Sequence, residues 1–203
     1  TRRSSDLTKN NLHTVKDLLY YLPRAYQNRG DVKSLNQEEF YDEYHSYILT
    51  VGSEPKSVGL NRGRGLNLLK FKAFDETGSV NITYFNQNYL KDVFHIGATF
   101  RFWGKVTKEK RTLNLSSPSY DAVIPDKHLA PLVSVYPLFS GVNQKYLSKL
   151  IREIIANVPL MMTDYLPESI RNSMGLCTLP YALRNIHFPD SEDALDRAIK
   201  RLT

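Results

Sequence analysis

The chain has 203 residues, of which 41% are hydrophobic and 24% charged, with 27 Lys or Arg against 21 Asp or Glu. This length allows one good hydrophobic core and a second, smaller one. No apolar run approaches the roughly 18 residues that a membrane-spanning helix needs, so we expect no membrane partner and a cytoplasmic location. Cys177 is the only cysteine, which excludes an intramolecular disulfide and a cysteine-rich zinc site.

Most of the net charge of +6 lies in the middle of the chain. Residues 44–124 hold eleven Lys or Arg and six Asp or Glu, so five of the six excess positive charges fall in this range. The same range has the alternating pattern of strands. A positive excess on one small domain favours a surface that binds a polyanion.

The first predicted helix follows Thr14, which can cap it with Asp17 at the third helical position. Its apolar stripe consists of Val15, Leu18, Leu19 and Leu22, and Pro23 ends it. The charged, Tyr-rich residues that follow indicate an extended connector. We therefore expect an N-terminal helical segment and connector over residues 1–43.

From residue 44 onward the pattern changes to strands that alternate polar and apolar side chains. The predicted strands cover residues 47–56, 66–74, 79–85, 99–107 and 112–120, and a short helix covers 87–94. Three strands, a helix and two strands is the order of an OB-fold, a five-stranded barrel that often binds single-stranded nucleic acid. We therefore expect an α+β chain with a mainly β core, an OB-fold β-barrel over residues 44–124.

After residue 125 the pattern becomes helical. Helices are predicted over residues 143–157, 167–174, 179–186 and 191–202. Thr178 is the expected cap of the third of these helices, and Pro180 lies in its first turn. We expect residues 125–203 to form a helical linker that flanks the barrel.

A large ring stands in an unusual position at the end of the third predicted strand. Counting by twos, Phe85 lies on the same face as Asn81 and Thr83, which is otherwise polar. An exposed ring in a basic protein can stack on a nucleic-acid base. Tyr89, four residues on, can present a second ring beside it or pack against Val93 on the short helix. The pattern leaves both alternatives open.

Basic residues on the predicted barrel are candidate contacts to a nucleic-acid backbone. They are Arg62 and Arg64 on the Gly-rich loop between the first two strands, Lys70 and Lys72 on the second strand, and Arg101 and Lys105 on the fourth. The loop at this position of OB-folds commonly contacts nucleic acid. Each set can equally be a solvated, charged surface. Trp103 shares a face with Arg101 and Lys105, so it can offer a stacking platform or pack against the N-terminal helix.

The sequence lacks the motifs of catalysis. No glycine-rich phosphate loop ending in Lys and Ser or Thr is present, and residues 75–78, which resemble an acidic helicase box, fit a hairpin turn better. The five histidines, at positions 13, 45, 95, 128 and 187, lack the spacing of a metal site. We therefore assign no catalytic residue, no metal site and no cofactor to this segment.

One segment resembles a family signature. Residues 84–91, Tyr-Phe-Asn-Gln-Asn-Tyr-Leu-Lys, are similar to the FFNQPYLK signature in the wedge domain of the RecG family of bacterial DNA helicases. Three further segments resemble the same family in the same order: residues 13–26, residues 135–138 with 143–145, and residues 182–189. These ordered matches make the chain similar to the N-terminal wedge region of that family.

The resemblance implies a parent protein that is an ATP-dependent DNA helicase. Such a helicase remodels stalled replication forks and recombination junctions by strand separation and branch migration, in DNA repair and recombination. The implied partners are branched DNA, such as forks and Holliday junctions, and the protein's own C-terminal helicase domains, which would bind ATP and Mg²⁺. We expect a nucleoid-associated monomer in which residues 125–203 lead to the motor, while the segment itself is not an enzyme.

The resemblance also implies a role for two aromatic residues. In the family, the aromatic residues of the signature are thought to stack on bases where the arms of a fork diverge. By position these are Phe85 and Tyr89, and Asn88 stands in place of the proline of the signature.

Two functions of other classes remain open from the sequence. The barrel can dock a protein partner, with DNA affinity incidental, or it can be a general binding module for single-stranded nucleic acid. Salt dependence discriminates the first alternative, because binding to phosphates weakens steeply with ionic strength. A preference for unstructured strands over branched duplexes would indicate the second.

Overall fold

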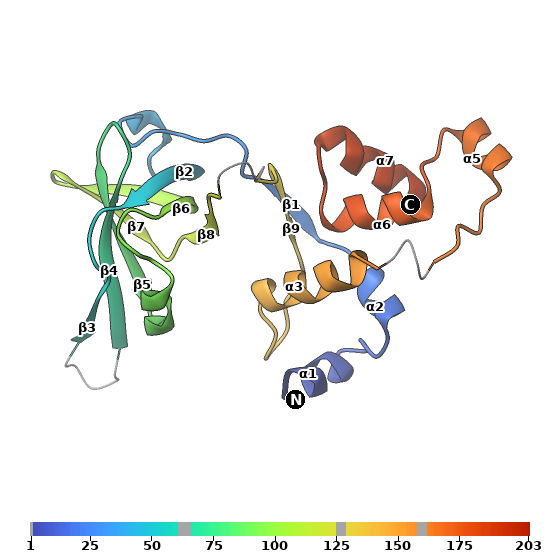
Figure 1. Cartoon of the computed structure of the whole chain (residues 1–203), viewed down its shortest axis with the longest axis horizontal. Helices are drawn as coiled ribbons and strands as arrows, with labels where there is room; N and C mark the ends of the chain where they lie inside the picture. The colour runs from blue at the N-terminus through green and yellow to red at the C-terminus, as the bar shows by residue number, and fades with distance from the viewer. Residues whose placement is uncertain (1, 61–65, 125–128, 158–161) are drawn as a thin grey trace. The chain divides into compact units, whose positions relative to one another are not determined.

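The computed structural model describes residues 2–60, 66–124, 129–157 and 162–203. The chain forms two compact units (Figure 1). We call Arg29–Leu129 the barrel unit, and we call Thr1–Asn28 together with Ala130–Thr203 the helical unit.

The barrel unit has the strand order of an OB-fold. Its elements are β2 (Tyr44–Val51), β3 (Lys56–Leu60), β4 (Leu66–Phe74), β5 (Ser79–Phe85), the 3-10 helix η2 (Asn88–Asp92), β6 (Thr99–Glu109), β7 (Thr112–Ser116) and β8 (Ser119–Ala122). The main sheet runs β2-β4-β5-β7-β6, and pairing of β6 with β2 closes it. Strands β5 and β7 are parallel, and the other pairs are antiparallel. The predicted OB-fold barrel is therefore confirmed.

Several predicted boundaries in the barrel unit differ from the structure, including the start of the first strand at Tyr44 and the end of the fourth at Glu109. The first predicted strand, 47–56, ends at Val51, and a separate strand begins after Pro55, which has no N–H to donate to a ladder. The last predicted strand, 112–120, divides into β7 and β8 because Ser117 has φ 45° and Pro118 follows it. The predicted helix 87–94 is the single 3-10 turn η2.

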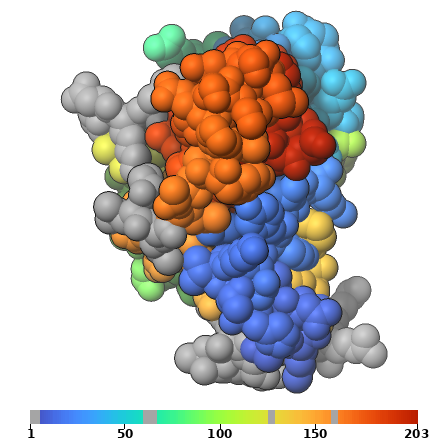
Figure 2. Space-filling model, turned by 90° about the vertical axis from the view of Figure 1, so that its right-hand side faces the viewer, coloured from blue at the N-terminus to red at the C-terminus, as the bar shows by residue number. Residues whose placement is uncertain are grey.

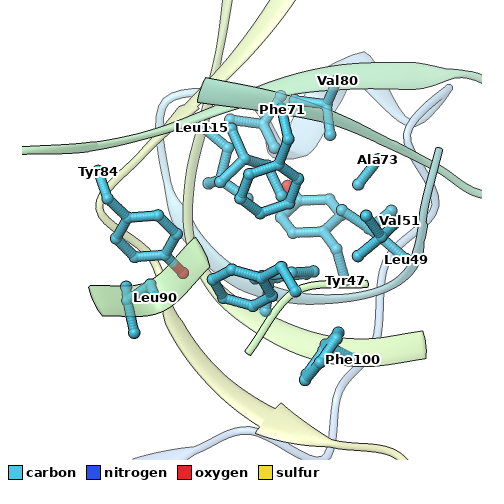
Figure 3. Close-up of a cluster of buried hydrophobic side chains, with 14 of the residues drawn as sticks. Tyr47, Leu49, Val51, Phe71, Ala73, Val80, Tyr84, Leu90, Phe100 and Leu115 are labelled. Carbon is cyan, nitrogen blue, oxygen red and sulfur yellow. The ribbon is translucent and has the colours of Figure 1, made fainter. Parts of the chain in front are cut away.

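The barrel closes around a core of aromatic and aliphatic side chains (Figure 3). Phe94 is fully buried, and its ring centroid lies 4.7 Å from that of Phe71 and 5.6 Å from that of Tyr84. The Tyr84 hydroxyl donates a hydrogen bond to the carbonyl oxygen of Pro118 at 2.9 Å. Leu90, on η2, is also buried in this core (Figure 3). Tyr84 and Leu90 thus fix the segment between them from both ends.

The helical unit joins the two ends of the chain. Its elements are α1 (Arg2–Lys9), α2 (Val15–Leu19), β1 (Ala25–Asn28), β9 (Leu132–Val135), α3 (Gln144–Ile155), α5 (Glu168–Met174), α6 (Leu179–His187) and α7 (Glu192–Leu202). Strands β1 and β9 pair antiparallel, and buried leucines of α1 and α2 share one core with α3 and α6. Residues 1–28 of the expected range 1–43 and residues 130–203 of the expected range 125–203 thus belong to one unit, whereas residues 29–43 belong to the barrel unit.

The helix starts follow local capping chemistry. Thr14 and Asp17 form the predicted capping box at α2, and Thr178 accepts a hydrogen bond from the N–H of Tyr181 at α6. Asn143 and Ser191 cap α3 and α7 in the same way. The predicted helices of the C-terminal range are confirmed, each to within two residues at its ends.

Helix α5 is held at its ends rather than by a buried face, since none of its residues is buried. Figure 2 shows it (orange) at the surface beside the red C-terminal helix. Lys200 on α7 donates hydrogen bonds to the carbonyl oxygens of Met174 and Gly175. Asp164 precedes α5 and receives hydrogen bonds from Arg201 and the N–H of Leu179. Burial opposes ionisation of Asp164, but these donors outweigh it and lower its pKa.

A neutral histidine lies inside the helical unit. His187 is fully buried, with Nε2 2.8 Å from the carbonyl oxygen of Leu19 and Nδ1 2.9 Å from the Tyr136 hydroxyl. A carbonyl only accepts, so Nε2 carries the proton and the Tyr136 hydroxyl donates to Nδ1. Burial lowers the pKa of His187, although the bond to Leu19 opposes this. Protonation of His187 would place a charge in a buried site. It would also put a proton on Nδ1, which already accepts a hydrogen bond from Tyr136.

We expect this site to make stability depend on pH. Because the pKa of His187 is lower in the folded chain, the unfolded chain binds a proton first as the pH falls below about 6.5, and the free energy of unfolding then decreases by up to about 1.4 kcal/mol per pH unit. Urea unfolding between pH 7.5 and 5 measures this loss. His187→Gln, which keeps a donor toward Leu19, should show a smaller loss, and His95→Gln, at an exposed position, should match the parent. Equal pH slopes in all three proteins would contradict the assignment.

Candidate nucleic-acid interface

A group of lysines occupies the outer face of the barrel over β3 and β4. Alternation along β4 buries Leu69 and Phe71 and leaves Lys70 and Lys72 exposed, as predicted. Lys56 on β3 pairs directly with Lys70 in the register of the sheet. We call Lys56, Lys70 and Lys72 the basic strand face.

Where the structure describes the chain, the lysines of the basic strand face have no acidic partner. Among the residues that the structure describes, the ion pairs involve other lysines and arginines, and none involves these three lysines. Like charges directly opposite each other on neighbouring strands destabilise a sheet. The next positions across the sheet are neutral, with Thr83 opposite Lys70 and Asn81 opposite Lys72. This face therefore carries uncompensated positive charge beside groups that can form hydrogen bonds.

An apolar row borders the basic strand face. Val58, Leu68 and Phe85 lie side by side on β3, β4 and β5, because Val58 pairs with Leu68 and Leu68 pairs with Phe85. Val58 is 43% exposed and Phe85 44%, whereas Leu68 between them is 7% exposed. The sequence analysis missed Val58 and Leu68. The alternation of β4, which places Leu68 on the face of Lys70, carried the signal for Leu68.

The two candidate stacking rings flank a tight turn. Tyr84 and Leu90 point into the core, so Phe85 and Tyr89 next to them point outward. Tyr89 is 67% exposed, and its hydroxyl donates to Oε1 of Gln87 at 3.2 Å. This exposure leaves little of the ring for the alternative in which Tyr89 packs on Val93. Both rings are thus available to a ligand on the same barrel.

The turn between the rings depends on an unusual backbone conformation. Asn86 has φ 54°, in the left-handed region that non-glycine residues seldom adopt. Its N–H donates to the carbonyl oxygen of Asn67 at 2.8 Å, and its Oδ1 accepts from the N–H of Asn67 at 3.1 Å. Asn88, at the place of the signature proline, begins η2.

The structure corrects the expectation for Arg101. Its side chain is 4% exposed, and Nη2 donates to Asp121 at 2.9 Å, while Nη1 donates to the carbonyl oxygen of Arg29 at 3.2 Å. The chain near Arg29 runs along β2, where the hydroxyl of Ser46 also donates to the Arg29 carbonyl. The predicted solvated strand face is therefore wrong at this position, and the guanidinium is already paired.

The remaining candidates lie in three different settings. Lys105 is exposed on β6, opposite Tyr44 of β2. Trp103 is half-buried, with its ring centroid 5.9 Å from that of Tyr44 and the Arg29 guanidinium 5.6 Å from the ring. The two loop candidates, Arg62 and Arg64, lie outside the described residues.

The described residues form neither a metal site nor a membrane-spanning helix. Where the structure describes the chain, His, Cys, Asp and Glu side chains do not gather in groups of three or more that could hold a metal ion. Within the same ranges, no helix is both long and apolar enough to cross a membrane. The basic strand face and its two rings are therefore the candidate site that we pursue.

Curated relatives are similar to this chain over nearly its whole length. The ATP-dependent DNA helicase RecG of a Synechocystis strain is 26% identical over 230 residues, which cover 100% of this chain and 26% of the relative. The RecG proteins of Thermotoga maritima and Bacillus subtilis are 26% and 27% identical over 98% and 94% of the chain. The chain thus spans about a quarter of the length of these relatives.

A solved structure and a family model agree with these relatives. The structure of RecG bound to a three-way DNA junction matches 97% of this chain and 27% of the solved chain, with a TM-score of 0.83 and 24% sequence identity. That likeness supports the fold. The family model of the RecG wedge domain matches residues 1–158, well over half of the chain. The chain therefore belongs to the RecG wedge domain family.

Proposed function

We propose that this chain is the branched-DNA-binding wedge of a RecG-like ATP-dependent DNA helicase. The observation that carries the proposal is the outer face of the barrel, where three lysines without an ion pair among the described residues lie near the exposed ring of Phe85. The exposed ring of Tyr89 follows four residues later, on η2. The parent protein would remodel stalled forks and recombination junctions, including Holliday junctions, in DNA repair and recombination. Its motor domains, which this chain does not contain, would hydrolyse ATP with Mg²⁺.

The lysines supply affinity that does not depend on sequence. Lys56, Lys70 and Lys72 would each neutralise phosphates and release counterions from the DNA. Phosphate contacts position a protein on a duplex but carry no base sequence. Lys105 is a further contact to the DNA backbone in this proposal, and so are Arg62 and Arg64, which lie between β3 and β4 in the sequence. The protein would then recognise the shape of a junction rather than its sequence.

The rings supply the contact that a plain duplex cannot use. At a branch point the last base pair of an arm exposes its flat face, whereas inside a duplex every face is already stacked. Phe85, with Val58 and Leu68 beside it, and Tyr89 would cover that face. As a motor pulled the DNA, this covered end would hold the strands apart. Trp103 would be a second stacking position, reached beside the exposed Tyr44.

The parent protein would act as a monomer in the cytoplasm, associated with the nucleoid. Residues 125–203 would lead to its helicase domains. The matching RecG structure is described as bound to a three-way DNA junction, which supports a junction as the substrate of this chain.

We expect loss of either ring to weaken binding to a junction. Each stacking contact is worth about 1 to 3 kcal/mol, so Phe85→Ala and Tyr89→Ala should each raise the Kd for a three-way junction roughly 5- to 150-fold. Fluorescence anisotropy with a three-way junction, a plain duplex and a single strand measures the effect. The Kd for the duplex should change much less.

Tyr165→Ala is the matched control for this experiment. Tyr165 is 68% exposed, close to the 67% of Tyr89, but it belongs to the helical unit. Its removal should leave junction binding unchanged. Equal binding to all three DNAs, with Kd values unchanged in both ring variants, would contradict the wedge proposal. Tighter binding to the single strand than to the junction would favour a general single-strand module.

We expect the basic strand face to govern the salt dependence. Lys70→Gln and Lys72→Gln should weaken the junction and the duplex alike, and each should reduce the slope of log K against log salt by about 1. Lys149→Gln, which removes the same charge from the helical unit, is the control. Binding that is strong, insensitive to salt and unchanged in both variants would instead indicate an apolar interface with a protein.

A further inference from the structure

We propose that Asn86 is a positioning residue, which sets the direction of the two rings and ties them to the start of β4. The inference rests on the proposed function, because it concerns how the stacking rings are held. Asn86 lies between Phe85 and Tyr89 in sequence, and in this proposal it does not contact DNA itself. Its contribution would come through its backbone conformation and its two hydrogen bonds to Asn67.

The backbone conformation of Asn86 sets the course of the chain between the two rings. The segment must keep Tyr84 and Leu90 in the core while turning from a strand into η2 within a few residues. The left-handed φ of 54° at Asn86 makes this reversal directly after Phe85. Asparagine adopts this region more readily than other residues with a β-carbon, whereas alanine does not. A residue that resists this conformation would move the peptide planes that carry Phe85 and lead to Tyr89.

Two hydrogen bonds join Asn86 to Asn67 on β4. Asn67 both donates to Asn86 Oδ1 at 3.1 Å and accepts from Asn86 N–H at 2.8 Å, so a backbone pair and a side chain join the same two residues. Asn67 also pairs with Gly59 of β3 in the sheet register. The turn between the rings is thus fixed to the β3–β4 hairpin, and next to this joint Phe85 pairs with Leu68. We call these two bonds the Asn67–Asn86 clip.

The clip places the candidate contacts on one rigid frame. Phe85 precedes Asn86 on β5, so it lies next to one end of the clip. Asn67, at the other end, belongs to the paired strands β3 and β4 that carry Lys56 and Lys70. Stacking requires a ring with a fixed plane, because affinity is lost when binding must first order a mobile group. The structure therefore assigns Asn86 the task of holding the rings in place before DNA arrives.

Substitutions of Asn86 separate the contribution of its backbone conformation from that of its side chain. Asn86→Gly keeps the left-handed backbone without strain but removes the side-chain acceptor. Asn86→Ala removes the acceptor and disfavours the backbone conformation as well. The Kd for a three-way junction should therefore rank parent, Gly variant and Ala variant from tightest to weakest, with about a tenfold loss for Asn86→Ala, comparable to the loss of one stacking contact.

Asn11→Ala controls for strain alone. Asn11 has φ 60°, close to the value at Asn86, but it lies in the helical unit. The substitution should cost similar stability in thermal unfolding and leave junction binding unchanged. If Asn86→Ala does not fold, Asn86→Gly still tests the clip. Hydrogen exchange at the N–H of Asn67 should be faster in that variant than in the parent, measured without DNA, because the acceptor Oδ1 of Asn86 is removed.

A double-mutant cycle distinguishes positioning from a general loss of stability. In the background of Phe85→Ala with Tyr89→Ala, Asn86→Ala should have no further effect on the junction Kd, since no ring is left to position. The same tenfold loss in that background would overturn the positioning role while leaving the proposed function intact. Ring variants that bind as the parent does would overturn both. A junction Kd for Asn86→Ala equal to that of the parent, with both ring variants weakened, would overturn the positioning role alone.

Discussion

The closed aromatic core of the barrel is the constraint on which the outward side chains depend. Phe94 lies in contact with the rings of Phe71 and Tyr84, and strands from both edges of the sheet meet around it. Because side chains alternate along a strand, burying Tyr84 commits Phe85 to the outer surface. A slip of one residue would exchange these two positions and lose both the core and the site. The same residues that stabilise the barrel therefore decide which rings face solvent.

Local signals predicted much of the fold. Alternation placed β4 and β5 at their observed bounds, and the predicted caps Thr14 and Thr178 placed the starts of α2 and α6. Helix α1 and the strands β1 and β9 escaped prediction. The two strands pair across more than a hundred residues of chain, so neither carries a local pattern that identifies its partner. The joining of the two chain ends into one unit follows from the same distant pairing.

The candidate site was predictable where its residues belong to one strand and not where a distant segment intervenes. Lys70 and Arg101 have the same position in an alternating pattern, yet Lys70 is exposed and Arg101 is buried. The difference comes from the chain around Arg29, whose carbonyl accepts from Arg101, and from Asp121 on β8. Periodicity describes the strand alone, so it cannot register a segment that crosses its outer face. The role of Asn86 was missed for a related reason, because its partner Asn67 lies on another strand.

Three local costs gather on one part of the barrel. Lys56 faces Lys70 across a strand pair, the large rings of Phe85 and Tyr89 are exposed to water, and Asn86, which has a β-carbon, holds a left-handed backbone. Each of these lowers the stability of the isolated barrel. A polyanion with exposed base faces would neutralise the lysines and cover the rings, and it would make use of the fixed turn. Unfavourable features that one ligand would relieve together are typical of a binding surface. Unrelated unfavourable features would not all be relieved by the same ligand.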